Sequence, residues 1–157
     1  MLDKTIIGRV EVVAFPHIAK ESLHARVDTG AQSSAIWARA KEEDGRLSVV
    51  FFDKGHPLYD GVAHYFDDFT YGMVASSNGQ AEGRYKVRLS IKIAGKRIRA
   101  RFTLADRSTQ VYPVLIGRNI LRGKFVVDVK QGNALVTRER EHSDALQSKV
   151  QPSPKRK

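Results

Sequence analysis

Hydrophobic and polar residues alternate strictly along two neighbouring segments of the chain. Apolar residues occupy every second position from 87 to 93, and again from 98 to 104. A two-residue period places such side chains on one face of a β-strand, and the Ala94-Gly95 pair between the segments suits a tight turn. The pattern therefore predicts a β-hairpin with one apolar face. Its other face carries the basic residues Lys86, Arg88, Lys92, Arg97, Arg99 and Arg101.

Further strands are expected along most of the chain. Apolar or alternating stretches predict strands over residues 6–15, 23–27, 47–52, 69–75 and 111–116. The Asn78-Gly79 turn extends the first hairpin into a meander, and residues 117–121 suit one short helix. Residues 125–129 are expected to pair with residues 134–136, whereas residues 53–69 show no regular pattern. The predicted fold class is all-β.

Length and composition limit the remaining choices. A chain of 157 residues suits one domain, which we place at residues 1–137. The remainder, residues 138–157, loses the periodicity and is expected to be a basic, disordered tail. No apolar run is long enough to span a membrane, and the first residues do not resemble a signal peptide, so we expect a cytoplasmic protein. The absence of cysteine excludes disulfides, thiol catalysis and zinc fingers.

The chain is strongly basic, with a formal net charge of +10. This balance favours an anionic partner, which could be a nucleic acid, a membrane surface or an acidic substrate. The arginines of the hairpin could be a solvated face or a groove for an acidic chain. Because the aromatic residues are not grouped as a stacking platform, an RNA-binding barrel is the weaker choice and a nucleic-acid partner is not expected.

One carboxylate lies where chemistry is expected. Asp28-Thr29-Gly30 follows directly on the predicted strand 23–27, and glycine allows a sharp loop there. The simplest interpretation of three such residues is an Asp that bonds to amides of its own turn. A second element changes this interpretation, because the apolar strand 111–116 runs into Gly117-Arg118-Asn119-Ile120-Leu121.

Together, the segments 27–31 and 114–121 resemble those of retropepsin-like aspartic proteases. The similarity extends from about residue 6 to residue 136 and is strongest to a bacterial family labelled ATP-dependent zinc proteases or RimB-type proteases. Further matching stretches are 7–9, 25–38, 76–79, 102–107 and 115–128. The resemblance implies a closed β-barrel with a long flap hairpin and one short helix.

The resemblance also implies roles for individual residues. Asp28, Thr29 and Gly30 would be catalytic, with Asp28 holding the attacking water. Ala31 and Gln32 would bind substrate together with the flap residues Ser76, Ser77, Asn78 and Gly79. Gly117 and Arg118 would be structural, and Arg118 would need a partner such as Asp106 or a carbonyl group. Since the chain holds one such motif and catalysis by this chemistry needs two carboxylates, the resemblance implies a homodimer.

Neither a metal nor ATP is expected as a cofactor. A zinc hydrolase commonly carries an H-E-x-x-H helix, which is missing here, and the spacing of His56 and His64 does not suit a metal site. A phosphate-binding P-loop is also missing.

Two functions remain. The leading hypothesis is an aspartic peptidase that trims acidic, glutamate-rich peptide tails, a substrate class that RimB-type relatives are associated with. The alternative is a non-catalytic module of the same fold that binds a ribosomal, nucleic-acid or protein partner through its basic face.

Overall fold

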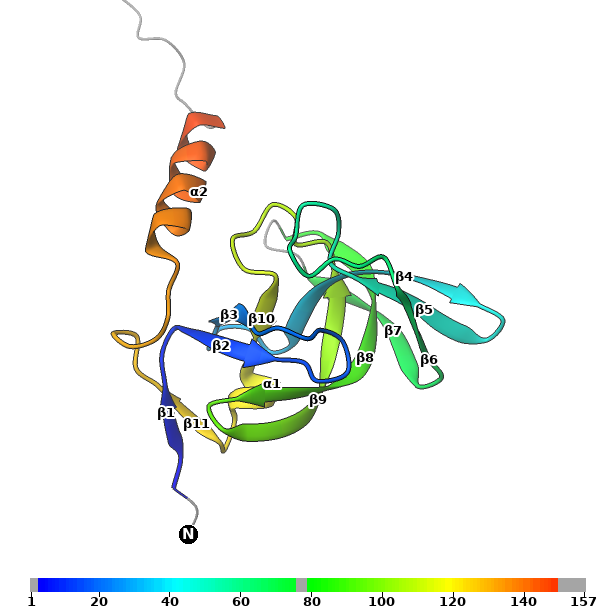
Figure 1. Ribbon diagram of the computed structural model, residues 1–157, viewed down its shortest axis with the longest axis horizontal. Coiled ribbons are helices and arrows are strands. Elements are labelled where there is room, and N and C mark those ends of the chain that lie inside the picture. Colours follow the sequence, from blue (N-terminus) through cyan, green and yellow to red (C-terminus); the bar gives the residue numbers. More distant parts are fainter. Residues whose placement is uncertain (1–2, 76–78, 150–157) are drawn as a thin grey trace, which may run out of the picture.

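The computed structural model describes residues 3–75 and 79–149, and shows a β-barrel from which one helix projects (Figure 1). The strands are β1 (Thr5–Ile7), β2 (Val10–Ala14), β3 (Leu23–Val27), β4 (Ser34–Glu43), β5 (Arg46–Phe51), β6 (Ala63–Phe66), β7 (Phe69–Ala75), β8 (Ala81–Ile93), β9 (Lys96–Ala105), β10 (Val114–Ile116) and β11 (Phe125–Val127). The helices are α1 (Arg118–Leu121) and α2 (Val136–Lys149).

Six strands close into a ring, in the order β10, β3, β2, β8, β9 and β4. The ring closes at β10, which pairs in parallel with β3 on one side and antiparallel with β4 on the other. The predicted all-β class with a closed barrel and a short helix at its end is therefore confirmed. The same closure places the ends of β3 and β10 side by side, with β3 leading to Asp28 and β10 leading to α1.

The barrel interior follows the predicted two-residue period. In β8, Val87, Leu89, Ile91 and Ile93 are all buried, and β9 contributes the fully buried Phe102. The ring of Phe102 meets that of Phe15 edge to face, with their centroids 5.4 Å apart. Each such buried side chain contributes roughly 1.5–3 kcal/mol through removal of apolar surface from water. This core holds the strand ends, and hence the loops beyond them, in fixed positions.

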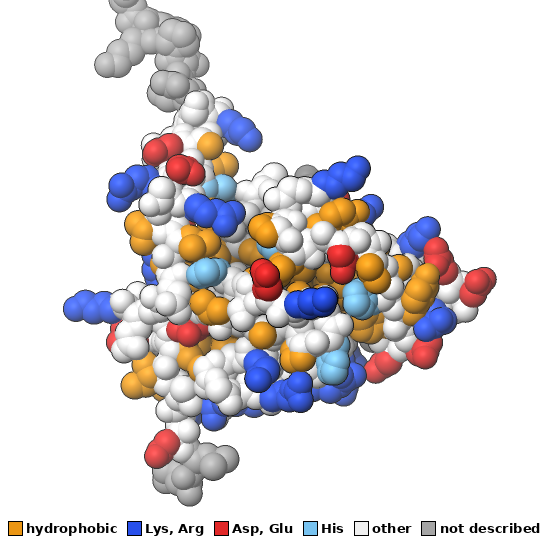
Figure 2. Space-filling model, viewed as in Figure 1, with side chains coloured by type: hydrophobic (Ala, Val, Ile, Leu, Met, Phe, Trp, Pro, Cys, Tyr) orange, Lys and Arg blue, Asp and Glu red, His pale blue; other side chains and the backbone are white. Residues whose placement is uncertain are grey.

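Two hairpins extend from β8. The predicted β8–β9 hairpin is present, and its register places Arg88 opposite Arg101 and Lys92 opposite Arg97. Figure 2 shows Lys and Arg side chains gathered along the lower edge of the molecule, over β8 and β9. We call the six basic residues of this outer face the basic stripe. On the other side, β7 pairs antiparallel with β8 over its whole length, as predicted.

Several local predictions were wrong, and in the first two cases a distant partner decides the structure. The predicted strand 6–15 is divided at Gly8, where any Cβ atom would lie 2.1 Å from the carbonyl of Gln131. Residues 125–127 pair in parallel with β1, and not with residues 134–136. Residues 63–66, expected to be irregular, form β6 against β5. Strand β4 was not predicted at all.

The predicted absence of regular structure beyond residue 137 was also wrong, since α2 extends to Lys149. None of its residues is buried, and Figure 1 shows the helix pointing away from the barrel. It lacks the apolar stripe by which a packed helix is recognised, but its sequence is rich in the strong helix formers Arg, Glu, Ala, Leu and Gln. Within the described ranges, no helix is long and apolar enough to cross a membrane.

Candidate functional site

Asp28 lies on a tight loop at the end of β3. Its backbone N–H donates to the carbonyl of Ile116 in β10 (2.9 Å), so the loop begins from the closed barrel. The Gly30 N–H donates to Asp28 Oδ1 at 2.9 Å, and the Ala31 N–H donates to the Asp28 carbonyl at 3.2 Å. Asp28 is half-buried, whereas Thr29 and Gly30 are exposed. The loop thus presents its carboxylate at the surface in a fixed orientation.

The start of α1 supports this loop from behind. The backbone N–H groups of Arg118 and Asn119 donate to the carbonyls of Ala31 (2.8 Å) and Gln32 (3.2 Å). The Arg118 guanidinium donates to the carbonyls of Thr29 at 3.2 Å and Gly30 at 2.9 Å. Of the two partners considered for Arg118, the structure therefore selects carbonyl groups. The two motifs that the sequence singled out, around Asp28 and around Gly117, are in direct contact.

Gly117 is required where these segments meet. A Cβ atom on Gly117 would lie 2.4 Å from the Ser33 carbonyl oxygen and 2.9 Å from that of Ala31, so no larger residue fits. Its N–H donates to the hydroxyl oxygen of the fully buried Ser34 at 2.9 Å. The Ser34 hydroxyl in turn donates to Asn119 Oδ1 at 2.7 Å, and Asn119 Nδ2 donates to the Arg101 carbonyl. Asn119 belongs to the motif that the sequence singled out but was given no role there, and Ser34 was not recognised as a site residue.

Asp28 is one of several Asp residues whose side chain accepts an N–H of its own turn. Asp60, Asp106 and Asp128 each accept an N–H from the residue two positions later in the same way. The hydrogen bonds of the Asp28 side chain therefore match the simplest interpretation, an Asp that accepts an amide N–H of its own turn. What distinguishes Asp28 is the support from α1 and the position at the junction of β3 and β10.

Positive charge gathers beside Asp28. Arg107 is partly buried, and its Nε donates to the Tyr112 carbonyl at 3.0 Å. Burial, followed by the nearby charges of Arg26 and Arg84, lowers the pKa of Arg107 to about 10, while the Asp28 carboxylate acts in the opposite direction. The sequence analysis gave no role to Arg107 or Arg26, although Arg107 is the last residue of the matching stretch 102–107. The tertiary fold decides which groups lie beside a charged residue, so the sequence alone could not show that these arginines lie near Asp28.

The remaining predicted residues have different outcomes. Ser76, Ser77 and Asn78 lie outside the described residues. Gly79 is exposed and has a φ of 84°, a conformation that favours glycine at a hairpin turn. Thr29 contributes its carbonyl oxygen to the contact with Arg118, and its catalytic role stays a prediction.

The histidines do not form a metal centre. His56 stacks on Phe52 with a centroid distance of 4.5 Å and accepts the Leu58 N–H at Nδ1, while His64 packs edge-on against Phe51. Over residues 3–75 and 79–149, no group of three or more His, Asp or Glu side chains could hold a metal ion. The residues present do not fit the zinc that the family label implies.

Comparisons with known proteins identify similar sequences and one similar solved structure. Two similar curated proteins are each named "Probable alpha-L-glutamate ligase". The one from Shewanella pealeana is 31% identical over 143 residues, and the one from Desulfotalea psychrophila is 29% identical over 134 residues. They cover 85% and 81% of this chain, which spans only 30% and 28% of their own lengths.

A similar solved structure is that of a protein of unknown function from Legionella pneumophila. It has a TM-score of 0.61 and 26% sequence identity, and the match covers 83% of this chain and 97% of that one. Residues 6–137 match the model of the RimB-like family, described as "Retropepsin-like aspartic endopeptidase RimB". This stretch contains the Asp28 loop, α1 and the whole barrel, so the chain belongs to the RimB-like family of retropepsin-like aspartic endopeptidases.

Proposed function

We propose that the chain is an aspartic endopeptidase in which Asp28 activates the water that attacks a peptide bond. One observation carries this proposal: the Asp28 carboxylate lies at the surface on a loop that α1 holds through the carbonyls of residues 29–32. A fixed carboxylate beside the substrate can take a proton from water without reorganising during the reaction. Membership of a family of aspartic endopeptidases supports the same chemistry.

The mechanism needs a second carboxylate, and we propose that a second copy of the chain supplies it. Two Asp28 side chains would share one proton across a two-fold axis. One carboxylate would take a proton from water as its oxygen attacks the carbonyl carbon, and the other would protonate the carbonyl oxygen. Collapse of this intermediate breaks the C–N bond, and a proton passes to the departing amine. In this arrangement, Ala31, Gln32 and the tip of the β7–β8 hairpin would bind the peptide.

We propose acidic, glutamate-rich peptides as the substrate. Arg26 and Arg107 lie on the same side of the barrel end as Asp28, and the whole chain carries a charge of +10. Such charge raises the local concentration of an acidic peptide. The curated relatives are named probable alpha-L-glutamate ligases, and this reference to glutamate supports a glutamate-containing substrate. The chain corresponds to less than a third of those proteins.

The test compares two Asp-to-Asn variants that share the same type of turn. Asp28→Asn keeps the side-chain oxygen that accepts the Gly30 N–H but removes the base, so hydrolysis of a glutamate-rich peptide should fall at least about 100-fold. Asp60→Asn, in an exposed loop, should leave the rate unchanged. Peptide fragments would be measured by mass spectrometry, with circular dichroism to verify folding. Equal rates for Asp28→Asn and the unaltered chain would refute the proposal.

A second candidate function rests on the basic stripe. Its like charges face each other directly at Arg88–Arg101 and Lys92–Arg97, which destabilises a strand pair unless an anion lies over them. This favours a module that binds an acidic partner without catalysis. Binding of such a partner would survive Asp28→Asn and be weakened by Arg97→Gln and Arg99→Gln, the reverse of what the peptidase requires.

A further inference from the structure

A cavity of about 350 Å³ lies directly beside the Asp28 loop. Val27, the residue before Asp28, lines it, and its ionisable lining residues are Arg9, Arg26, Arg107, Tyr112, His142 and Glu139, with Gln110 as a further polar neighbour. Three arginines in one small cavity create a strongly positive site. We call this the arginine cavity.

Two of these arginines have no anion of their own. Among residues 3–75 and 79–149, neither Arg26 nor Arg107 forms an ion pair with a carboxylate. Arg107 is partly buried, and the protein atom that it binds is the neutral carbonyl oxygen of Tyr112. Withdrawing an unpaired guanidinium from water costs free energy. An acidic ligand that paired with Arg107 would recover part of that cost, and the exposed Arg26 would add a second attractive charge.

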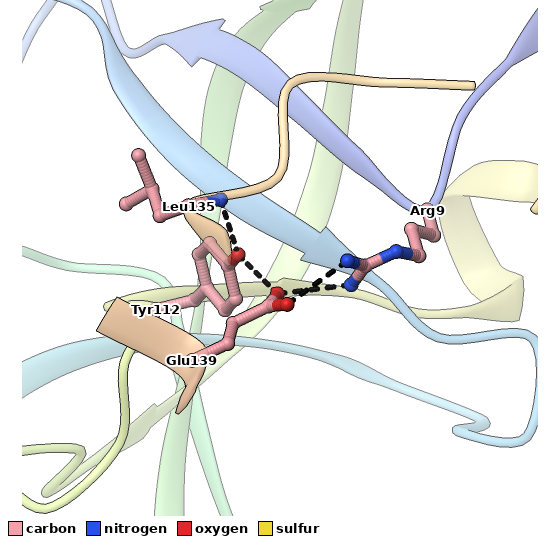
Figure 3. Close-up of polar contacts among 4 residues, drawn as sticks. All are labelled: Arg9, Tyr112, Leu135 and Glu139. Atoms are coloured by element: carbon pink, nitrogen blue, oxygen red, sulfur yellow. Dashed lines mark hydrogen bonds and ion pairs between the residues drawn. The ribbon is translucent and has the colours of Figure 1, made fainter. Parts of the chain in front are cut away.

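The third arginine already holds a carboxylate, and that carboxylate belongs to a glutamate. Arg9 donates from both terminal nitrogens to Glu139 of α2, each at 2.9 Å, and the Tyr112 hydroxyl also donates to Glu139 (Figure 3). Arg26 is close enough for its charge to lower the pKa of Glu139, after the larger effect of the Arg9 hydrogen bonds. The arginine cavity therefore has the chemistry to bind a glutamate side chain carried by a peptide segment.

The helix that supplies Glu139 is attached to the barrel through few described contacts. No residue of α2 is buried, so its described attachments are polar: the contacts of Glu139, and a hydrogen bond between His142 and the Thr109 carbonyl at 2.8 Å. The Arg9–Glu139 pair is bidentate and so is stronger than a single surface contact, but both side chains are partly exposed, so an added carboxylate can compete for Arg9. A peptide with several carboxylates could displace Glu139.

We propose that the arginine cavity is a subsite for a glutamate side chain of the substrate, bound by Arg26 and Arg107, and that Glu139 competes for it from within the chain. The choice of a peptide substrate rests on the proposed peptidase function, whereas the carboxylate site rests on the cavity alone. The cavity adjoins the loop that carries Asp28, so a glutamate bound there places the neighbouring peptide bond near that carboxylate. In the free protein, Glu139 and α2 restrict access.

The test measures binding of tetraglutamate to the full chain carrying Asp28→Asn, which prevents turnover. In this background, Arg107→Gln and Arg26→Gln should each raise the Kd about tenfold or more, as expected for loss of a charged hydrogen-bonding group. Glu139→Gln should lower the Kd about threefold to tenfold, because the competitor loses its charge. The control Arg122→Gln removes the same charge from an exposed position at the end of α1 and should leave the Kd unchanged. Tetraglutamine should bind no variant measurably.

The outcomes separate the parts of the proposal. Binding by Arg107→Gln and Arg26→Gln that equals binding by Arg122→Gln would overturn the subsite, and an unchanged Kd for Glu139→Gln would overturn the competition. Arg26 is exposed, so Arg26→Gln stays informative where Arg107→Gln fails to fold. Cleavage by the chain with Asp28 intact is measured separately. If the expected changes in Kd occur and no peptide is cleaved, the peptidase function fails and the carboxylate site stands.

Discussion

A single hydroxyl group joins the two segments of the candidate site. Ser34 accepts the N–H of Gly117 and donates to Asn119, so it connects the start of β4 with the start of α1. Because Ser34 is fully buried, water cannot replace either bond. The position of the Asp28 loop therefore depends on a residue with no part in the chemistry.

Ser34→Ala should lower the free energy of unfolding by about 1–3 kcal/mol, since it leaves a buried N–H group without a partner. Ser48→Ala is the matched control, because Ser48 in β5 is also buried and no side-chain hydrogen bond is described for it. That variant should lose less than about 1 kcal/mol. Urea denaturation of both variants measures the difference. Equal losses would mean that the Ser34 hydroxyl contributes only its volume.

At the scale of elements, the sequence predicted those parts whose pattern is local. The strand 23–27, the β7–β8 and β8–β9 hairpins and the short helix α1 follow from alternation and turn residues. Strand β4 was not predicted because its buried positions are Ser34, Ile36 and Ala38. Since one of these residues is polar and another is small, the alternation of apolar and polar residues is not visible in the sequence. The parallel pairing of β1 with β11 joins segments more than a hundred residues apart, which no local pattern can indicate.

The same limit applies to the candidate site. The Asp28 and Gly117 motifs are consecutive residues on single loops, and both could be read from the sequence. Ser34, Arg26 and Arg107 acquire their importance from neighbours brought together by barrel closure. A buried serine or an isolated arginine has no sequence signature of its own.

The attachment of α2 should depend on pH. Hydrogen bonds from Arg9, and then from Tyr112, lower the pKa of Glu139 from its ordinary value of 4.5. The attached form therefore binds protons less readily than the free form, so the contact is fully present above pH 4.5 and is lost as the pH falls through the lowered pKa. The other ionisable groups that line the cavity with Glu139 are Arg9, Arg26, Arg107, Tyr112 and His142.

The amide of Leu135 reports this attachment, because it donates to the Tyr112 hydroxyl at 2.9 Å (Figure 3). Its NMR chemical shift should move toward the value for a free amide below pH 4.5. In Glu139→Gln the shift should already lie nearer that value at neutral pH and show no titration in this range. A titration that persists in Glu139→Gln would assign the effect to another group.

At the scale of the whole molecule, the proposed dimer can be tested by disulfide cross-linking through one introduced cysteine. The chain has no cysteine, so an introduced one has only its counterpart in another copy to react with. Thr29→Cys lies on the exposed loop beside Asp28, and mild oxidation should convert it to a covalent dimer if the two-fold axis passes there. Val62→Cys, in the exposed loop before β6, should stay monomeric on a non-reducing gel.

Sedimentation of the unaltered chain should show a reversible dimer. A monomer at high concentration would contradict the proposal that two Asp28 carboxylates share a proton.

The barrel closes through β10, a strand of only three residues that lies about three quarters of the way along the chain. During synthesis, β3 and β4 leave the ribosome long before the strand that must join them. Until residues 114–116 emerge, both strands present open edges, which are prone to mispairing with other chains. Asp28 acquires its support from α1 still later, because α1 follows β10. A nascent chain therefore exposes the aspartate for most of its synthesis without the geometry in which the residue could act.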